Sequence, residues 1–176
     1  MISLLMVLGG FIYTNFLEWV FHRYLLHGLG KKKGSPWAFH LGHHRECFRY
    51  KNYDKDYKRI FDSQNFNELK SLGLVALLHL PLALVSFYFY LGAALGGVLY
   101  FVLHRKSHID TKWGKKYMPW HYVHHMQKSN MNWCVTYPLF DKLLGTYLPY
   151  EEKNTHKSAR NKSKPEDGVS GSSDHS

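Results

Sequence analysis

Ten of the thirteen histidines stand in clusters whose spacing suits metal binding. In each half of the sequence a histidine pair is followed by twelve other residues and then by a His-x-x-His-His box. The two sets are His22, His27, His40, His43 and His44 in the first half, and His104, His108, His121, His124 and His125 in the second. Residues i, i+3 and i+4 share one face of a helix, so each box presents three imidazoles together.

The two pairs differ in how well they fit a regular helix. His104 and His108 are four residues apart and share a face. His22 and His27 are five residues apart, which turns them by about 140° on an ideal helix. The sequence therefore predicts a helix end or a local distortion between His22 and His27.

The number and type of these side chains indicate which metals they could hold. Neutral imidazole binds iron, copper, nickel and zinc, and one ion takes about four to six ligands. Ten imidazoles therefore indicate two ions. A ligand set without carboxylates or thiolates disfavours magnesium, calcium and iron–sulfur clusters. Iron and zinc remain open. A solvated histidine patch or a purely structural zinc site is the alternative, which the repeated spacing argues against.

Two apolar segments must position the histidines. Residues 1–21 carry one formal charge, Glu18, and are long enough as a helix to cross a bilayer. A signal peptide is the alternative, but a basic leading region and a small-residue cleavage site are missing. Residues 71–104 hold no Asp, Glu, Lys or Arg, and their 34 residues exceed one crossing. We expect membrane segments at about 2–21, 69–90 and 92–108, the last two joined near Leu91–Gly92, with Pro81 and glycines as break points.

The charge distribution predicts how the chain is oriented. The net charge of +10 and the mean hydropathy of −0.36 would suit a soluble basic protein, but the charge is segregated. Basic residues fill 22–70 and 105–150, which the positive-inside rule places in the cytoplasm. The sequence thus predicts an all-α integral membrane protein of about three to four membrane helices, with a helical, histidine-rich cytoplasmic cap. Residues 1–150 form this domain, and 151–176 are a polar tail expected to be disordered.

The same charges bear on partners. Basic runs at 31–33 and 112–116 lie between the paired boxes, where anionic lipid head groups are the expected partner. A nucleic-acid partner would require these charges on a water-facing domain, and we expect none.

The residues around the boxes resemble a known superfamily. The segment from Glu18 to His27, EWVFHRYLLH, resembles the first histidine box of the fatty acid 2-hydroxylases. The box at His121, followed by FDKLLGT at 140–146, is similar to the end of the same domain. Over about residues 11–148 the chain resembles the fatty acid hydroxylase and sterol desaturase superfamily. Bacterial carotenoid hydroxylases are similar in length and use related boxes.

This resemblance implies a membrane non-haem di-iron oxygenase. The ten histidines would hold two iron ions, or zinc, and O2 would be the co-substrate in hydroxylating a lipid C–H bond, most simply of a fatty acyl chain. Desaturation, or a sterol or carotenoid substrate, stays open. Some members carry a fused cytochrome b5 domain; here a separate donor, a cytochrome b5-like protein or a ferredoxin, is implied. An alternative of another class is a membrane protein that binds or transports zinc or iron. A transporter should hold its ligands near the middle of the bilayer, whereas the boxes here lie outside the apolar segments, which argues against this alternative.

Five further polar residues are candidates for supporting roles. Glu18 could accept a hydrogen bond from His22 four residues later, or be a charge at the membrane interface. Asp141 could support a ligand or cap a helix, and capping is the expected role. Asn130, with its neighbour Asn132, could bind a ligand histidine or a head group, or be solvated in a loop. His79 belongs to no box and is expected to bond a neighbouring helix.

Overall fold

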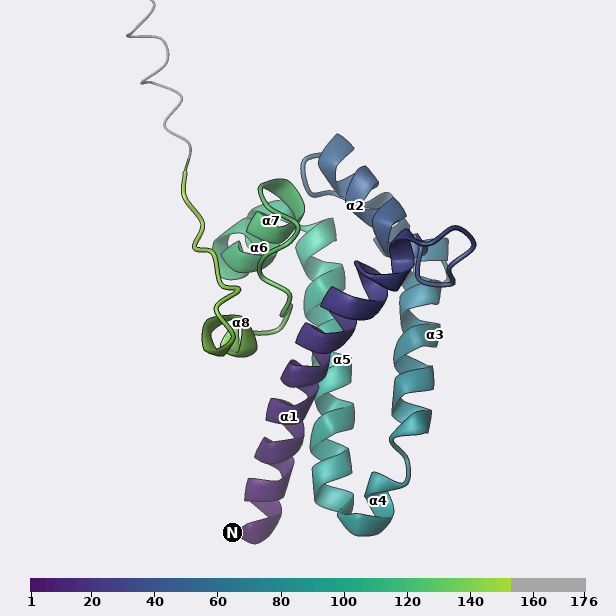
Figure 1. The fold of residues 1–176 in the computed structure, drawn as a ribbon, viewed down its shortest axis with the longest axis vertical. Helices are drawn as coiled ribbons and strands as arrows, with labels where there is room; N and C mark the ends of the chain where they lie inside the picture. The colour runs from purple at the N-terminus through teal and green to yellow at the C-terminus, as the bar shows by residue number, and fades with distance from the viewer. Residues whose placement is uncertain (153–176) are drawn as a thin grey trace, which may run out of the picture.

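The computed structural model describes residues 1–152, and helices are the only regular elements within that range (Figure 1). They are α1 (Ile2–Val20), η1 (Phe21–Leu26), η2 (Leu29–Lys31), α2 (Phe39–Arg49), η3 (Lys55–Tyr57), α3 (Ser63–Leu78), α4 (Leu82–Val85), α5 (Phe87–Ile109), α6 (Thr111–Tyr117), α7 (Pro119–Met126) and α8 (Leu139–Leu143). The predicted all-α class is confirmed for these residues. Apart from its first two residues, the polar tail lies outside the described residues.

Two long helices, α1 and α5, cross each other closely along the length of the bundle (Figure 1). Glycines make this approach possible. A Cβ atom at Gly92 would overlap the carbonyl group of Val7, and one at Gly10 would overlap the carbonyl oxygen of Phe89. Helices of membrane proteins use small residues in this way to bring their backbones together. The pairing fixes η1, which continues α1, relative to the upper part of α5.

The apolar stretch from 71 to 104 does fold back on itself, but not where we expected. Helix α3 ends before His79, the short α4 follows Pro81, and α5 begins after Ser86, whose hydroxyl accepts the backbone N–H of Phe89 at 3.3 Å. The predicted junction near Leu91–Gly92 is therefore wrong, because α5 runs through Gly92 without a break. Proline, which lacks an N–H, and a serine cap end and start the helices here.

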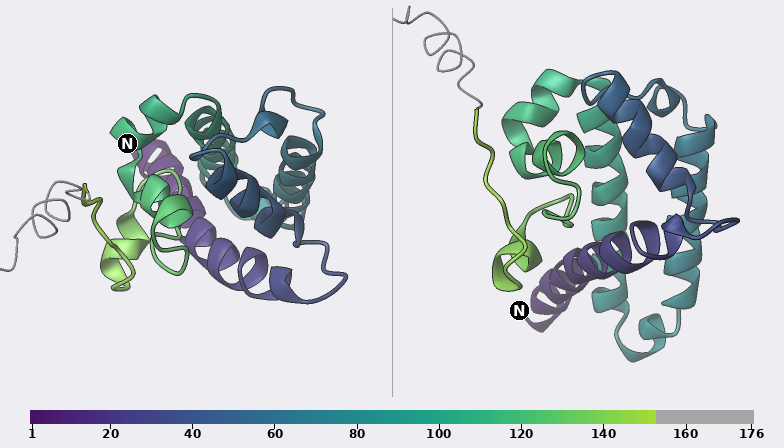
Figure 2. Two further views of the ribbon diagram at one scale, coloured as in Figure 1. Left: turned by 90° about the horizontal axis from the view of Figure 1, so that it is seen from above. Right: turned by 45° about the horizontal axis from the view of Figure 1, so that its top comes forward.

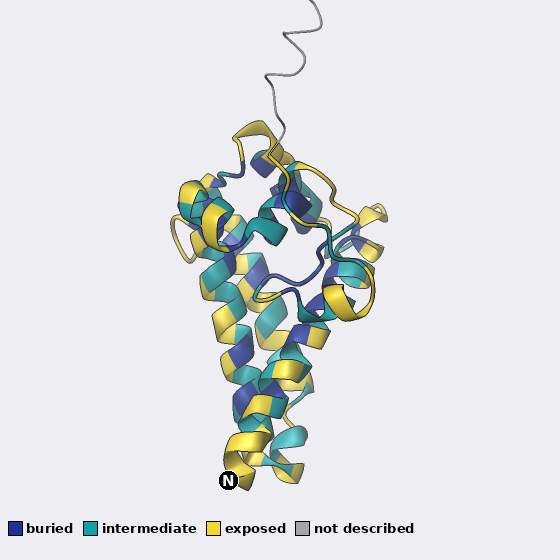
Figure 3. Ribbon diagram, turned by 90° about the vertical axis from the view of Figure 1, so that its left-hand side faces the viewer, coloured by how far each residue is buried: buried dark blue, intermediate teal, exposed yellow. Residues whose placement is uncertain are grey.

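Two helices are long and apolar enough to cross a membrane, within Ile2–Lys31 and at Phe87–Ile109. Helix α3 has 16 residues, or about 24 Å, less than the roughly 30 Å of a bilayer core. Many of the exposed residues on α1, α3 and α5 are large apolar side chains. Buried residues gather toward the end of the bundle opposite the N-terminus (Figure 3). Both features fit a membrane protein.

Most of the remaining helices form a cap over the upper end of the bundle (Figure 2). It consists of α2, α6 and α7 with their connecting loops, whereas α8 lies lower, beside α1. Asp110 separates α5 from α6, since its side chain accepts the N–H of Trp113 at 3.0 Å. Pro119 then opens α7 in the first helical turn, where a missing N–H costs little. These stops turn the chain back so that α7 lies beside α2.

Candidate metal centre

The ten clustered histidines come from η1, α2, the end of α5, and α7, and their side chains converge. Figures 1 and 2 show these elements meeting at the upper end of the bundle. Their ring nitrogens form two groups of five. Site 1 contains His22, His27, His40, His44 and His124. Site 2, which combines two overlapping sets, contains His43, His104, His108, His121 and His125, and the thiol of Cys47 lies beside His43, His108 and His125. Within each set the nearest ligand atoms lie within 4.8 Å of one another, so all ten candidates are brought together in space.

Each His-x-x-His-His box divides its side chains between the two sites. His43, the middle histidine of the first box, belongs to site 2, and His124, the middle histidine of the second box, belongs to site 1. The two sites also touch, because the rings of His44 and His125 stack with their centroids 4.1 Å apart. Neither half of the sequence repeat therefore completes a site alone.

The expected distortion between His22 and His27 is a π-helical turn. In η1 the backbone N–H of His27 bonds to the carbonyl oxygen of His22 at 3.0 Å, which is the i to i+5 pattern of a π-helix. Residues five apart then follow one another along the same face. Both imidazoles consequently enter site 1, with ring centroids 5.0 Å apart. The prediction made from their spacing is confirmed.

Five of the rings are held from outside by hydrogen bonds from Nδ1. Two acceptors are carboxylates: His43 binds Asp54 Oδ2 at 2.7 Å, and His104 binds Glu68 Oε1 at 2.6 Å. Three are backbone carbonyl oxygens: His22 binds that of Trp133 (2.6 Å), His108 that of Asn52 (2.9 Å), and His124 that of Met131 (2.7 Å). Each ring thus has its hydrogen on Nδ1 and its Nε2 lone pair turned inward, as metal-bound histidines do.

The inward-facing nitrogens fit metal ions. Nε2 of His43 and Nε2 of His108 are 3.2 Å apart, yet both rings place their hydrogen on Nδ1, so no hydrogen lies between them. Two lone pairs at this distance repel each other unless they share a cation. Among the described residues, both ring nitrogens of His125 and Nε2 of His104 are buried without a hydrogen-bond partner. Buried polar atoms of this kind are rare in proteins unless they bind something.

Burial also keeps the rings in the form that binds metal. It lowers the pKa of all six histidines of α2 and α7 well below the ordinary value, namely His40, His43, His44, His121, His124 and His125. Neighbouring histidines add to the effect, because each would repel a second positive charge. The rings are therefore neutral at neutral pH, which is the state required of a ligand.

Glu18 does not orient His22, and neither expected role describes it. Its carboxylate is buried and accepts hydrogen bonds from the N–H of Val135 (2.8 Å), the N–H of Thr136 (2.9 Å) and the hydroxyl of Thr136 (2.7 Å). The acceptor for His22 is instead the carbonyl oxygen of Trp133 in the same segment. Glu18 therefore fixes the loop that fixes the histidine.

Asp141 does the same work from the other side, so the expectation that it caps a helix is wrong. It lies inside α8, whose N-cap is Pro138. Its carboxylate accepts the N–H groups of Trp133 and Cys134, both at 2.8 Å. Together, Asp141 and Glu18 bind four consecutive backbone N–H groups, 133–136. We call this segment the strap. It presents the Trp133 carbonyl to His22.

Neither asparagine forms a side-chain hydrogen bond with a histidine of the described residues. Asn130 is exposed, so its expected role beside a ligand is not supported. Asn132 is buried, and its amide group donates to the carbonyl oxygens of Trp120 (3.0 Å) and Leu148 (2.8 Å). It stabilises the loop after α7 and does not act on the site directly.

Four residues at the centre were missed in the sequence. Asp54 and Glu68 accept from ligand rings, and the carbonyl of Asn52 accepts from His108. Burial raises the pKa of Asp54 to about 6 although the N–H of Asp56 favours its charged form. Cys47 lies with its Sγ 3.3 Å from Nδ1 of His108. Only Cys47 had a local signal, since it follows His43 by four residues on the same face of α2.

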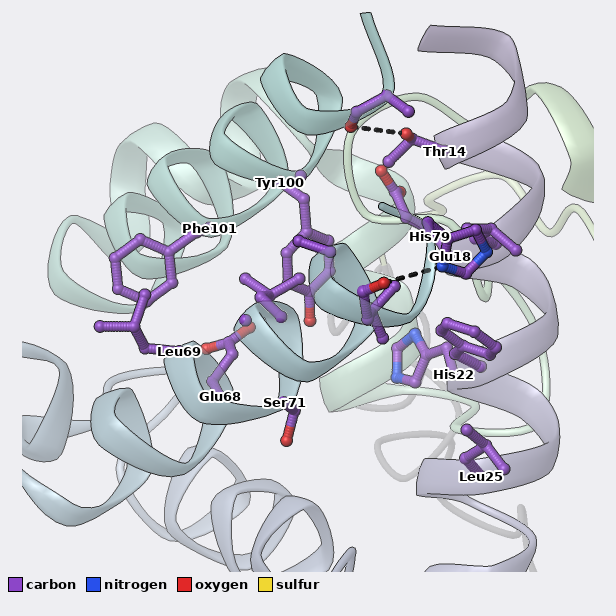
Figure 4. A pocket seen from close by; sticks show the side chains of 18 of the residues that line it. Thr14, Glu18, His22, Leu25, Glu68, Leu69, Ser71, His79, Tyr100 and Phe101 are labelled. Atoms are coloured by element: carbon purple, nitrogen blue, oxygen red, sulfur yellow. Dashed lines mark hydrogen bonds between the residues drawn. The ribbon is translucent and has the colours of Figure 1, made fainter. Parts of the chain in front are cut away.

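A cavity of about 540 Å³ leads from site 1 into the lower bundle, between α1, α3 and α5. Its walls are almost entirely apolar. Figure 4 shows residues of all three walls: His22 at the site, Glu68 and Ser71 on α3, and Tyr100 on α5. His79, at the end of α3, also lines it and binds the hydroxyl of Tyr13 on α1 at 2.9 Å. The expectation that His79 bonds a neighbouring helix is confirmed.

Comparison with known proteins gives one result. The family model described as fatty acid hydroxylase matches residues 7–146. This range includes all ten clustered histidines, the strap and the walls of the cavity. No curated protein matches the chain, and no solved structure matches it.

Proposed function

Because the chain belongs to the fatty acid hydroxylase family, we propose that it is a membrane-bound oxygenase that hydroxylates a C–H bond of a lipid, most simply of a fatty acyl chain. The observation that carries this proposal is that an apolar cavity ends at site 1, where His22 and His40 form part of its wall. An apolar chain in this cavity would bring one of its carbons to the histidines while the rest stays out of water.

The ten histidines would hold two iron ions, which supply the activation of O2 when bound. The overall reaction takes R–H, O2, two electrons and two protons to R–OH and water. The residues of the chain position and protect this chemistry. Asp54 and Glu68 fix the rings of His43 and His104, and the strap fixes that of His22. The apolar walls exclude water, so that only the part of the lipid at the site 1 end of the cavity meets the histidines.

The arrangement in the membrane is part of the proposal. We place α1 and α5 across the bilayer, with α3 and α4 as a third, shorter segment that enters it. The cap would then face the cytoplasm, where its basic residues meet anionic head groups. Electrons would come from a separate donor, a cytochrome b5-like protein or a ferredoxin, and no nucleic acid would take part.

Lipid analysis tests the proposed reaction. We would express the full chain and His124→Ala in a bacterial host together with a ferredoxin and its reductase, and compare total lipids by mass spectrometry. A lipid that gains one oxygen only with the unchanged protein supports hydroxylation, and one that loses two hydrogens supports desaturation of the same kind of substrate. A gain of oxygen on a sterol or carotenoid would redirect the substrate class.

A matched variant keeps this test specific. Tyr122→Ala changes the same helix, α7, at a side chain that packs on Tyr150 away from both sites. It should retain metal and product. Unchanged lipids with iron bound and a donor supplied would overturn the proposed activity and favour a metal-binding role. Full turnover by His124→Ala with complete metal loading would overturn the ligand assignment.

A further inference from the structure

The cavity has a polar floor, formed by a hydrogen bond that crosses it. Tyr13 on α1 and His79 at the end of α3 come from opposite walls, and the Tyr13 hydroxyl lies 2.9 Å from Nε2 of His79. The ring of Phe89 flanks Tyr13, with the centroids 5.5 Å apart. An ionisable side chain at membrane depth is costly and rare, so its position at the floor of a lipid cavity calls for a role.

The direction of this hydrogen bond determines what the floor can bind. Nδ1 of His79 donates to the carbonyl oxygen of Val75 at 2.8 Å, which leaves Nε2 of the neutral ring as an acceptor. Tyr13 must therefore donate its hydroxyl hydrogen to His79. The lone pairs of the Tyr13 oxygen remain free, and they can accept a hydrogen bond from a ligand.

The other hydroxyls on the side of the cavity remote from site 1 also donate their hydrogens to protein acceptors. Thr14 donates to the carbonyl of Ala93 (2.9 Å), Ser71 to that of Asn67 (2.8 Å), and Tyr90 to that of Ala76 (3.3 Å). In the described residues that line this part of the cavity, each hydroxyl hydrogen is already used. This part of the cavity therefore offers acceptors to a ligand and would not satisfy a carboxylate or a ketone.

From these contacts we infer that the floor formed by Tyr13 and His79 recognises a hydroxyl group on the lipid, at the end remote from the carbon that reacts. The inference deepens the proposed function and rests on it. The substrate is then a lipid with a polar end at the floor, such as a long-chain hydroxy lipid or a ring alcohol, and not a plain saturated chain.

The structure also sets the distance between the hydroxyl group at the floor and the carbon that reacts at site 1. Nine residues of helix separate His22 from Tyr13, or about 13 Å, and eleven residues of α3 separate Glu68 from His79, or about 16 Å. An extended chain advances about 1.2 Å per bond. The hydroxyl should therefore lie about 11 to 13 bonds from the carbon that reacts.

Binding of chain-matched acids tests the inference without turnover. The probes are 12-hydroxydodecanoic, 14-hydroxytetradecanoic and 16-hydroxyhexadecanoic acid, each against the unsubstituted acid of the same length. Their affinities for the metal-loaded full chain in detergent are measured by displacement of cis-parinaric acid. One net hydrogen bond should make one hydroxy acid bind about three- to tenfold more tightly than its partner.

Variants assign the preference to the floor. Tyr13→Phe alone would leave Nε2 of His79 free to accept from the ligand, so Tyr13→Phe is combined with His79→Leu to remove both acceptors of the floor. This double change should abolish the preference while unsubstituted acids bind as before, which also shows that the cavity is intact. Tyr88→Phe removes a tyrosine hydroxyl on α5 outside the cavity and should keep the preference. Equal affinities within every pair, or a preference that survives the double change at Tyr13 and His79, would overturn the inference alone. Failure of every acid to bind would overturn the proposed function with it.

Discussion

His43 lies in site 2 although its box neighbours lie in site 1, and His124 lies in site 1 although its box neighbours lie in site 2. We therefore predict that metal loss follows the two spatial sites and not the two sequence boxes. Two double variants separate these possibilities. The first, called the cross-box variant, combines His40→Ala with His124→Ala; it removes two ligands from site 1 and none from site 2. The second, called the same-box variant, combines His40→Ala with His43→Ala; it removes two ligands from one box but only one from each site.

The expected magnitudes differ strongly between the two variants. Loss of a residue that merely supports a ligand weakens metal binding about 10- to 100-fold, and loss of a ligand should cost at least the upper figure. The cross-box variant should therefore hold one ion as tightly as the unchanged protein and the other about 10⁴-fold more weakly. The same-box variant should hold both ions about 100-fold more weakly, since each site keeps four imidazoles.

Competition with a chelator, followed by metal analysis of the dialysed protein, distinguishes the two patterns. The cross-box variant should release its metal in two well-separated steps, and the same-box variant in one. Phe48→Ala with Tyr122→Ala changes α2 and α7 once each outside both sites and should behave as the unchanged protein. Two steps in the same-box variant and one in the cross-box variant would refute the assignment of His43 and His124.

Three further changes test the supporting contacts. Asp54→Asn removes the charge that His43 faces, and should weaken site 2 about 10- to 100-fold while site 1 is unchanged in the same chelator assay; equal losses at both sites would contradict this. Asp141→Asn replaces one of the two carboxylate oxygens that accept N–H groups of the strap by an NH2 donor. It should lower the free energy of unfolding by about 1–3 kcal/mol, measured as a lower melting temperature, and an unchanged melting temperature would contradict it. Gly92→Leu should push α5 away from α1 and abolish monodisperse folded protein on size-exclusion chromatography, whereas Gly97→Ala, where a Cβ meets open space, should not.

Much of the metal centre was predictable because ligand spacing is local information. The i, i+3, i+4 pattern places three imidazoles on one face of a short helix, and α2 and α7 are such helices. The mismatch at His22 and His27 even predicted a distortion, since only a change of helical period aligns residues five apart. The count of ten imidazoles predicted two groups, and two groups are found.

What the sequence could not supply depends on contacts between distant segments. Asp54 is one of three aspartates within nine residues, 54–62, and only the packing of its loop against α5 selects it for His43. The crossing of His43 and His124 likewise depends on how α2 meets α7. The helix break was misplaced because Gly92 looks like a break point in sequence, whereas in space it is the contact that lets α1 approach.

Helix α1 joins three functions that must keep a fixed spacing. Tyr13 forms the floor of the cavity, Glu18 holds the strap, and His22 enters site 1 one turn later. Because α1 continues directly into η1 and packs closely on α5 at Gly92, the helix sets the spacing between the floor and site 1. On the proposed function, the position of oxidation along a lipid is then set by helix length: the ligand is held at one end, and whichever carbon reaches His22 reacts.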